Sequence, residues 1–466
     1  MAFSDLHFLY LFLPVTVAVY YCMPDLRRKN LVLLAAGLLF YFMGQPHFLP
    51  VILMLAFLNW QLGFRVEVGA VKTLLLPVCA NVGFLLLTYM VAPVMTALER
   101  EANLLMPVGI GFFILSVISY HADLYRGKIR PENSFLNFLL YMTLLPKLPQ
   151  GPILRYDQAV KQIRGRKTNF RIAFDGVLRF SIGLGKKVLL ADPCARLIAS
   201  MEGNGELVLV GAWLSAVLFM MRIYFECSGC IDMAIGLGKI FGFRLPEDFD
   251  LPYSAGSVSE FCGKWHITLV SFFRDYVQEP LLDGQDSQSR RVGALLAACM
   301  LAVLWHGVTP NFWILGIYIF LLLVGEEIVS EYVQDLPYAL RNFLTMLLVL
   351  FGFAIFRNSD PAALKDTVKA MFGFSGFAVT GIGQTVLQSI PLLLACCIGA
   401  GPIPRQIGLL WSGLCGMNTK QGKSDGINLW KLVYVVVSLG FISLLLWLCT
   451  MVLVKYPTVP TIFGKL

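Results

Sequence analysis

The chain has 466 residues, of which 57% are hydrophobic and only 14% carry a charge. Soluble domains carry about 25% charged residues, so this composition excludes a water-soluble globular protein and indicates an integral membrane protein. The formal net charge of +8 does not point to nucleic acid. The basic residues lie in short loops between apolar runs, as the positive-inside rule predicts for cytoplasmic loops.

The apolar stretches predict an all-α polytopic membrane protein. A spanning helix needs about 20 apolar residues, and the chain offers about ten such stretches. We therefore expect roughly 10–12 transmembrane helices plus re-entrant or interfacial ones, all in one membrane domain over residues 1–466. Within it we expect N-terminal helices over 1–130, a core over 131–375 and C-terminal helices over 376–466. A closed β-barrel is excluded, because its strands alternate apolar and polar residues.

The N-terminal segments set the expected orientation. The apolar run 8–23 is followed by the basic residues 27–29 and preceded by Asp5, so we expect an extracytoplasmic N-terminus. The run has no cleavage signal and is a retained helix. The runs 31–42 and 48–60 are short, which fits either a kinked or re-entrant pair or two crossings.

The middle of the chain contains an irregular segment and a basic one. Three prolines within 146–152 cannot continue a helix, and such backbone at membrane depth must be buried in protein or line a cavity. The basic stretch 155–171 is either a plain cytoplasmic loop or an anion-attracting surface near the entry of a phosphorylated donor. Glycines 229, 236 and 238 indicate close helix packing. We expect an interfacial helix over 265–281 and a polar loop over 405–430.

Two of the five histidines, His266 and His306, follow a tryptophan at the edge of a lipid-soluble segment. A titratable ring at such a depth usually faces the protein interior and tends to be functional. Burial disfavours the imidazolium, so a neutral ring able to accept a proton is expected. Alternatively, His306 caps a helix end, and Lys264 and Asp275 hold His266 as a structural residue.

The remaining polar residues narrow the chemistry. Phosphate-loop, dinucleotide, zinc-helix and nucleophile-elbow motifs are absent from the sequence. Cys227 and Cys230 have redox or zinc spacing but lack a second pair, so we expect no metal and leave their role open. A neutral histidine suits acyl transfer, in which it removes the proton of an attacking hydroxyl, and a thioester donor brings its own leaving group. Trp265 and Trp305 are packing or anchoring residues, and Asp232 and Arg274 orient or pack the site.

Six ordered motifs resemble the membrane-bound O-acyltransferase family, most closely its alginate O-acetyltransferase (AlgI-like) branch. They are YFECSGCIDMAIG at 224–236, KWHITL at 264–269, RDY at 274–276, LWHG at 304–307, QGPILRY at 150–156 and GKKV at 185–188. The branch usually has Asp, Phe and Tyr where this chain has Glu226, Cys227 and Cys230, and Arg where it has Lys264.

The resemblance implies an inner-membrane enzyme with a defined site. His306 matches the invariant catalytic histidine, and His266 matches a second one on a helix lining the same chamber. Site support is expected from Trp305, Trp265, Lys264, Arg274, Asp275, Asp232 and Arg155. The donor would be acetyl-CoA or another acyl thioester with no bound cofactor. The acceptor would be an exported polysaccharide, reached with periplasmic SGNH-hydrolase-like partners and the polysaccharide export machinery.

Several alternatives stay open at this stage. Within the enzyme class, they are O-acetylation of peptidoglycan and D-alanyl transfer to teichoic acid. Outside it, they are a proton-coupled transporter or flippase using the histidines as a relay, and a structural subunit of a synthase complex.

Overall fold

The structure, a computed structural model, describes residues 2–97, 109–148, 150–203, 208–282, 287–358, 360–377, 381–415, 429–456 and 459. All regular elements in these ranges are helices, and one isolated bridge pairs Phe249 with Trp265. The first ten are α1 Leu13–Cys22, α2 Leu26–Gly44, α3 Leu49–Gly63, α4 Val71–Ala97, α5 Ile110–Tyr125, α6 Phe135–Met142, α7 Tyr156–Arg164, α8 Phe170–Gly185, α9 Asp192–Gly203 and α10 Leu209–Ile240. The others are α11 Val258–Lys264, α12 Ile267–Phe273, α13 Glu279–Leu282, α14 Gln288–Leu304, α15 Pro310–Gln334, α16 Tyr338–Arg357, α17 Pro361–Met371, α18 Ile382–Ala400, α19 Ile403–Leu414 and α20 Leu429–Lys455.

Seven helical segments in the described residues are long and apolar enough to cross a membrane. They are Pro46–Gly63, Val71–Val91, Leu209–Ile240, Pro310–Gln334, Tyr338–Arg357, Ile382–Ala400 and Leu429–Lys455. Six of these have at most 28% of their most apolar window buried inside the protein, so they present apolar side chains outward, as lipid-facing helices do. Phe8–Cys22 and Ile110–Tyr125 are shorter apolar helices. The all-helical, multi-pass prediction is confirmed.

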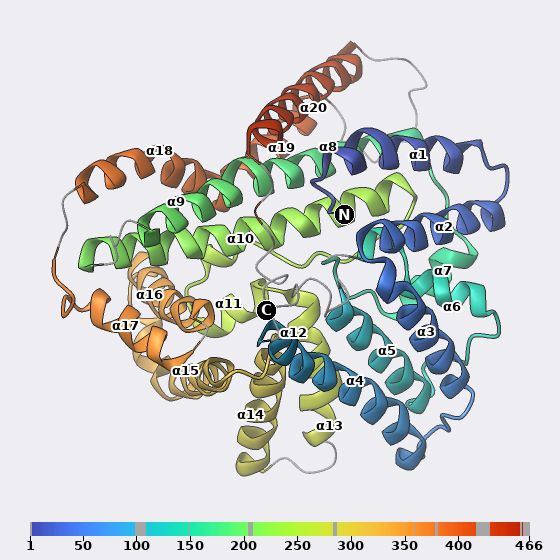
Figure 1. The fold of residues 1–466 in the computed structure, drawn as a ribbon, viewed down its shortest axis with the longest axis horizontal. Helices are drawn as coiled ribbons and strands as arrows, with labels where there is room; N and C mark the ends of the chain where they lie inside the picture. Colours follow the sequence, from blue (N-terminus) through green and yellow to red (C-terminus); the bar gives the residue numbers. More distant parts are fainter. Residues whose placement is uncertain are drawn as a thin grey trace.

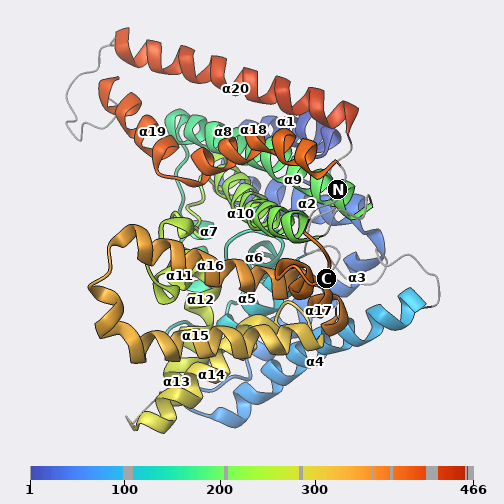
Figure 2. The ribbon, with the colours of Figure 1, turned by 90° about the vertical axis from the view of Figure 1, so that its left-hand side faces the viewer.

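Helix α10 is the exception, with 67% of its window buried, and it lies at the centre of the fold. Figures 1 and 2 show α8 and α9 running along it, with α20 beyond them and α4, α14 and α15 on the opposite side. Two glycine pairs bring α8 and α10 together. A Cβ on Gly236 would come within 2.7 Å of the Gly176 carbonyl oxygen, and one on Gly183 within 2.6 Å of the Gly229 carbonyl oxygen. The expected close packing is confirmed at these positions.

The proline-rich segment takes a buried, irregular path. A 3-10 turn spans Leu145–Lys147, and the next regular helix begins only at Tyr156. Pro149 lies outside the described residues. Lys147 is only 3% exposed, and its Nζ donates to the Tyr141 carbonyl oxygen at 3.2 Å. The described part of this backbone is therefore buried within protein, as expected, and its 3-10 turn packs against α10.

The structure also tests the predictions for three other segments, 31–60, 265–281 and 405–430. Helices α2 and α3 are separate, joined by a 3-10 turn over Pro46–Phe48. The stretch 265–281 forms α12, a π-helical turn Arg274–Gln278 and α13, which pack against α14. The prediction of a polar loop over 405–430 is wrong in its first part, because Ile403–Leu414 forms helix α19. The sequence of α19 is amphipathic, so its apolar side can face lipid or protein. Residues 416–428 lie outside the described ranges.

Candidate active site

His306 lies in the turn between α14 and α15. Helix α14 ends at Leu304, and the backbone N–H groups of His306 and Gly307 donate to the carbonyl oxygens of Val303 and Leu304 at 2.9 and 3.1 Å. The tight turn points the chain towards α15, whose Phe312 ring lies 6.3 Å from the His306 ring, centroid to centroid. The helix end therefore places the imidazole among aromatic side chains rather than in an open loop.

Trp305 is packed firmly beside this histidine. Its ring is 8% exposed and contacts the Phe112 ring edge-on at 4.9 Å. A Cβ on Gly111 would lie 2.8 Å from the Trp305 ring, so α5 can approach only with a glycine there. The Tyr89 hydroxyl donates to the Trp305 carbonyl oxygen. Helices α4 and α5 thus anchor the residue next to His306.

Burial favours the neutral form of the His306 ring. Burial, and in addition a charge on His266, lower the pKa of His306 from 6.5 to about 3. A neutral imidazole keeps a lone pair at physiological pH and can accept a proton. The same effect shows that the two histidines lie within electrostatic reach of one another.

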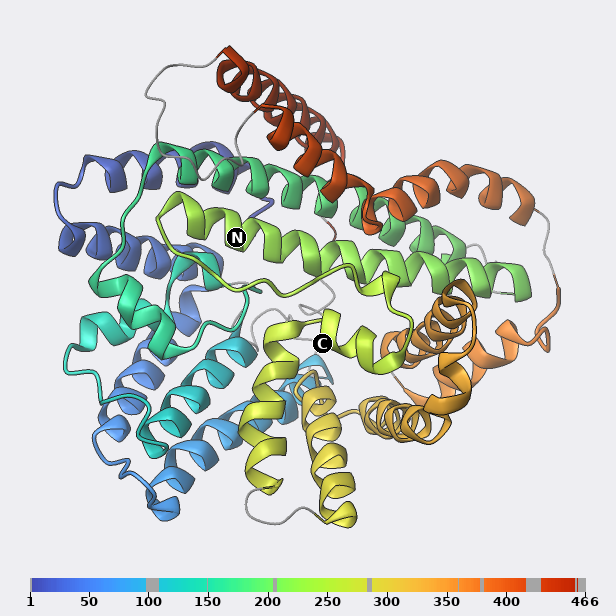
Figure 3. The same ribbon diagram turned by 180° about the vertical axis from the view of Figure 1, so that it is seen from behind.

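His266 is delivered by the extended segment 241–257 that follows α10. Figure 3 shows this segment running back alongside α10 before the chain enters α11. Two backbone hydrogen bonds pair it with the chain around His266, from Asp250 N to the Lys264 carbonyl at 3.1 Å and from Ile267 N to the Asp248 carbonyl at 3.0 Å. His266 itself adopts the left-handed conformation, with φ of +45°, at the start of α12. Such a conformation in a non-glycine residue is strained and is typical of functional sites.

Asp248 orients the His266 ring. Its Oδ2 lies 2.8 Å from His266 Nδ1, and its Oδ1 accepts from the backbone N–H and the hydroxyl of Thr268 at 2.7 and 2.6 Å. Both side chains are buried, at 1% exposure for Asp248 and 6% for His266. The carboxylate favours the tautomer with the proton on Nδ1, which leaves the Nε2 lone pair as an acceptor. Nε2 has no hydrogen-bond partner among the described residues.

Helix α16 joins the surroundings of the two histidines. Its Phe353 ring contacts Trp265 at 5.1 Å, and its Phe356 ring contacts His306 at 5.4 Å. Residues three apart lie on the same side of a helix, so one face of α16 borders both Trp-His pairs. The structure therefore brings together the four residues that the two motifs contribute.

Arg155, Arg274 and Asp275 form a second cluster, apart from the Asp248–His266 pair. The Asp275 carboxylate accepts from Arg155 and, at 2.9 Å, from Arg274 Nε. Both arginines outweigh the effect of burial and lower the pKa of Asp275. A hydrogen bond of 3.1 Å from Ile153 N to the Thr268 hydroxyl ties the chain just before Arg155 to α12. These residues hold the irregular segment against the His266 helix, and none of them contacts His266.

Asp232 supports the site from α10. Its Oδ1 accepts from Arg179 of α8, and its Oδ2 accepts from Lys186 at 2.7 Å. Arg179 also binds Glu247, the neighbour of Asp248. Asp232 thus fixes the start of the segment that carries Asp248 without reaching a histidine itself.

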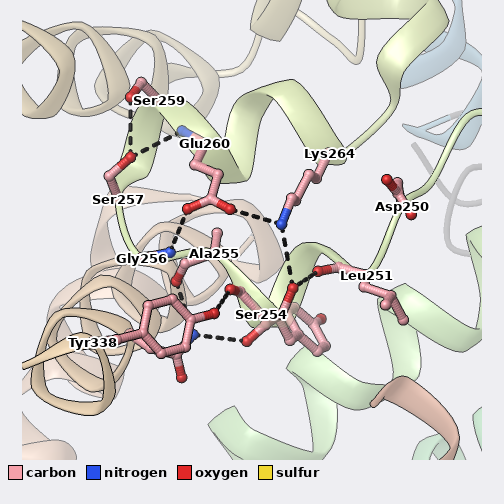
Figure 4. A network of polar contacts seen from close by, with 12 residues as sticks. Asp250, Leu251, Ser254, Ala255, Gly256, Ser257, Ser259, Glu260, Lys264 and Tyr338 are labelled. Carbon is pink, nitrogen blue, oxygen red and sulfur yellow. Dashed lines mark hydrogen bonds and ion pairs between the residues drawn. The ribbon is translucent and has the colours of Figure 1, made fainter. Parts of the chain in front are cut away.

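Lys264 turns away from the histidines. Its Nζ lies 2.7 Å from Glu260 and 3.3 Å from the Ser254 hydroxyl, in the polar network of Figure 4. Glu260 in turn accepts from Gly256 N at 2.7 Å. One alternative from the sequence is that Lys264 and Asp275 hold His266 in place. That prediction is wrong, because the carboxylate that contacts the His266 ring is that of Asp248. The sequence showed Asp248 only as one of three carboxylates in a polar segment, with no signal to select it.

The cysteine pair that the sequence left open shows no metal-binding arrangement in the described residues. Cys227 and Cys230 are free thiols on α10. Within the described ranges, no group of three or more His, Cys, Asp or Glu side chains is placed to hold a metal ion.

The fold defines an all-helical, multi-pass membrane protein in which two Trp-His pairs meet, and comparison with known proteins gives its family. The model of the membrane-bound O-acyltransferase family matches residues 113–359, which include both histidines. The chain belongs to this family and is an acyltransferase.

Relatives at three levels of similarity accompany this match. The chain is 31% identical over 418 residues to a probable alginate O-acetylase of Azotobacter vinelandii, covering 85% of this chain and 83% of that protein. It is 25% identical to a peptidoglycan O-acetyltransferase of Helicobacter pylori, over 82% of each chain. It is 23% identical to a teichoic acid D-alanyltransferase of Bacillus subtilis, over 54% of this chain and 69% of that protein.

Proposed function

We propose that the protein passes acetyl groups from a cytoplasmic thioester donor across the bacterial inner membrane for O-acetylation of an exported or cell-surface polysaccharide, alginate- or cellulose-like in kind. The similarity to alginate O-acetylases carries this proposal, because it reaches 31% identity over 85% of the chain. The peptidoglycan and teichoic acid relatives are less similar. Acetyl-CoA or another acyl thioester serves as the donor substrate, and the step uses no bound cofactor.

In the proposed reaction His306 is the general base. An acceptor hydroxyl loses its proton to the neutral imidazole as its oxygen attacks the thioester carbonyl carbon. The new ester C–O bond forms, the C–S bond breaks, and the thiolate leaves with the proton that His306 returns. The lowered pKa of His306 supports a neutral ring at the start of this sequence.

The geometry favours an assisting role for His266. Its Nδ1 contacts Asp248, so an imidazolium formed there would be stabilised by a buried carboxylate, the arrangement that orients a catalytic histidine in many hydrolases. We assign His266 to binding or proton transfer beside His306. Trp265 and Trp305 pack beside the two histidine rings, and Arg155 acts from a distance by holding the irregular segment against the His266 helix through Asp275.

Membrane placement and partners follow from the same proposal. The basic residues 27–29 on the first loop support a cytoplasmic position for that loop and an extracytoplasmic N-terminus. Every regular element in the described ranges is a helix, and seven helical segments there are long and apolar enough to cross a membrane. We therefore propose that periplasmic SGNH-hydrolase-like partners and the polysaccharide export machinery carry the acetyl group to the polymer.

The test is the acetyl content of the surface polymer in a deletion strain complemented with wild type, His306→Ala or His266→Ala at matched membrane abundance. The exposed His47→Ala is the matched control. We expect His306→Ala to abolish acetylation while polymer export continues, and His47→Ala to leave it unchanged.

Two results would contradict the proposal. Normal acetylation with His306→Ala would make that histidine structural and favour a transporter or scaffold. Loss of acetyl groups from peptidoglycan, or of D-alanine from teichoic acid, with an unchanged exopolysaccharide would move the acceptor to the class of the more distant relatives.

A further inference from the structure

A polar cavity of about 320 Å³ lies far along the chain from both histidines, where the α1–α2 turn meets the connection between α7 and α8. Its lining residues are Tyr20, Leu26, Lys29, Arg166, Lys167 and Thr168. Three of these six are cationic and none is acidic. The nearby carboxylate of Asp25 is engaged elsewhere, since it caps α2 and pairs with Arg28 at 3.2 Å.

The protein holds Arg166 through two of its three guanidinium nitrogens. Its Nε donates to the Phe241 carbonyl oxygen at 2.9 Å, and its Nη1 donates to the Asn30 side chain. The guanidinium also stacks 4.3 Å from the centroid of the Phe243 ring. Its Nη2 is buried and has no acceptor within the described ranges. A buried N–H donor without an acceptor destabilises the folded protein. An oxyanion that accepts from Nη2 would remove this cost, and a guanidinium whose plane is already fixed suits such a ligand.

The other cations lack carboxylate partners in the described chain as well. Lys29 Nζ lies over the rings of Tyr20 and Tyr21, at 5.4 and 5.9 Å from their centroids. Lys167 is exposed at the rim. Cationic side chains that lie close together without a carboxylate repel one another. An anion bound between them would be attracted to each of them and would offset that repulsion.

The wall of the cavity is tightly built. Gly242, at φ of +81°, passes so close to the α7–α8 connection that a Cβ there would lie 2.4 Å from Thr168 Cγ2. The Tyr20 hydroxyl donates to the Phe241 carbonyl oxygen at 2.7 Å. The turn after α10 therefore holds residues 166–168 in place against α1, and the cations stay together without a ligand to gather them.

We propose that this cavity binds a phosphate group through Lys29, Arg166 and Lys167. Phosphate matches a guanidinium fork flanked by lysines, and basic pockets between membrane helices bind phosphorylated head groups. The phosphate belongs either to an anionic phospholipid or to a soluble phosphorylated molecule. The site is independent of the proposed acyl transfer, because binding needs neither histidine nor turnover.

The experiment uses the full-length protein purified in detergent. Native mass spectrometry measures retention of phosphatidylglycerol against phosphatidylcholine, and the thermal midpoint is measured with inorganic phosphate against chloride at equal ionic strength. The variant Lys29→Gln with Lys167→Gln removes two lining charges. The control Arg27→Gln with Arg244→Gln removes two exposed charges outside the cavity.

We expect the lining variant to lose at least about tenfold in affinity for one probe while the control keeps it. Loss confined to phosphatidylglycerol identifies a lipid head group, and loss of the stabilisation by inorganic phosphate identifies a soluble source. Equal behaviour of wild type and lining variant with both probes, or an equal loss in the control, overturns the proposal. If the double variant does not fold, the exposed Lys167→Gln alone provides the comparison.

Discussion

His266 Nδ1 and Asp248 Oδ2 lie 2.8 Å apart, in a pair formed by residues 18 positions distant in the chain. Two backbone hydrogen bonds hold the two segments side by side, from Ile267 N to the Asp248 carbonyl and from Asp250 N to that of Lys264. The carboxylate thus sets both the ring orientation and the tautomer of His266. This relationship leads to the first of four predictions.

Asp248→Asn is expected to reduce acyl transfer on the order of 100-fold, the usual weight of a positioned acid–base group. Asparagine keeps the shape but offers no charge to stabilise an imidazolium, and its amide can favour the wrong tautomer. The matched control is Asp250→Asn, two residues away and paired at the surface with Arg405 at 2.8 Å. The measurement is the rate of acyl transfer in membranes that contain equal amounts of each variant. An Asp248→Asn rate equal to that of the control would remove Asp248 from the mechanism.

Gly111→Ala is expected to impair activity without preventing membrane insertion. The new methyl group would lie 2.8 Å from the Trp305 ring and must displace the residue next to His306. Gly293→Ala, on α14 with open space around its Cβ position, is the control. We expect at least about a tenfold loss of rate for Gly111→Ala, since misplacing a catalytic group by about 1 Å can cost 100-fold. Unchanged rates for both variants would mean that the Trp305 position does not matter.

Lys264→Gln is expected to preserve most of the transfer rate. Lys264 binds Glu260 and Ser254 rather than a histidine (Figure 4), so its loss loosens a partly exposed network. Exposed pairs of this kind contribute about 0–1 kcal/mol, which predicts a thermal midpoint lowered by a few degrees at most. A rate lost as completely as in His266→Ala, in protein of unchanged midpoint, would place Lys264 at the substrate instead.

The depressed pKa of His306 predicts a pH-dependent stability. Between its folded pKa of about 3 and its ordinary 6.5, the unfolded chain binds a proton that the folded one does not. Stability from this group therefore falls as pH drops below 6.5, by up to about 2 kcal/mol at pH 5. The thermal midpoint of wild type should fall more between about pH 7.5 and about pH 5 than that of His306→Asn. An equal fall in the two proteins would show that folding does not lower the pKa of His306, and His47→Asn serves as the control.

The class of protein and its motif residues were open to prediction from the sequence alone. Apolar runs of helical length dictate membrane helices, because lipid offers no partner for unpaired backbone groups. The Trp-His pairs stand out because polar rings are rare beside such runs. Glycines 229 and 236 predicted that α10 packs closely against another helix, but the sequence did not show that this helix is α8.

The assignment of partners depended on the tertiary structure. Acidic residues Asp248, Asp250 and Asp275 look alike in the sequence, yet the first binds His266, the second Arg405 and the third Arg155. Phe353 and Phe356 carry no sequence signal of a site, and α16 sets them against Trp265 and His306. Hydrophobic pattern and composition are local properties, which the sequence determines by itself. Which carboxylate meets which base depends on backbone pairing between distant segments, and only the folded chain decides that.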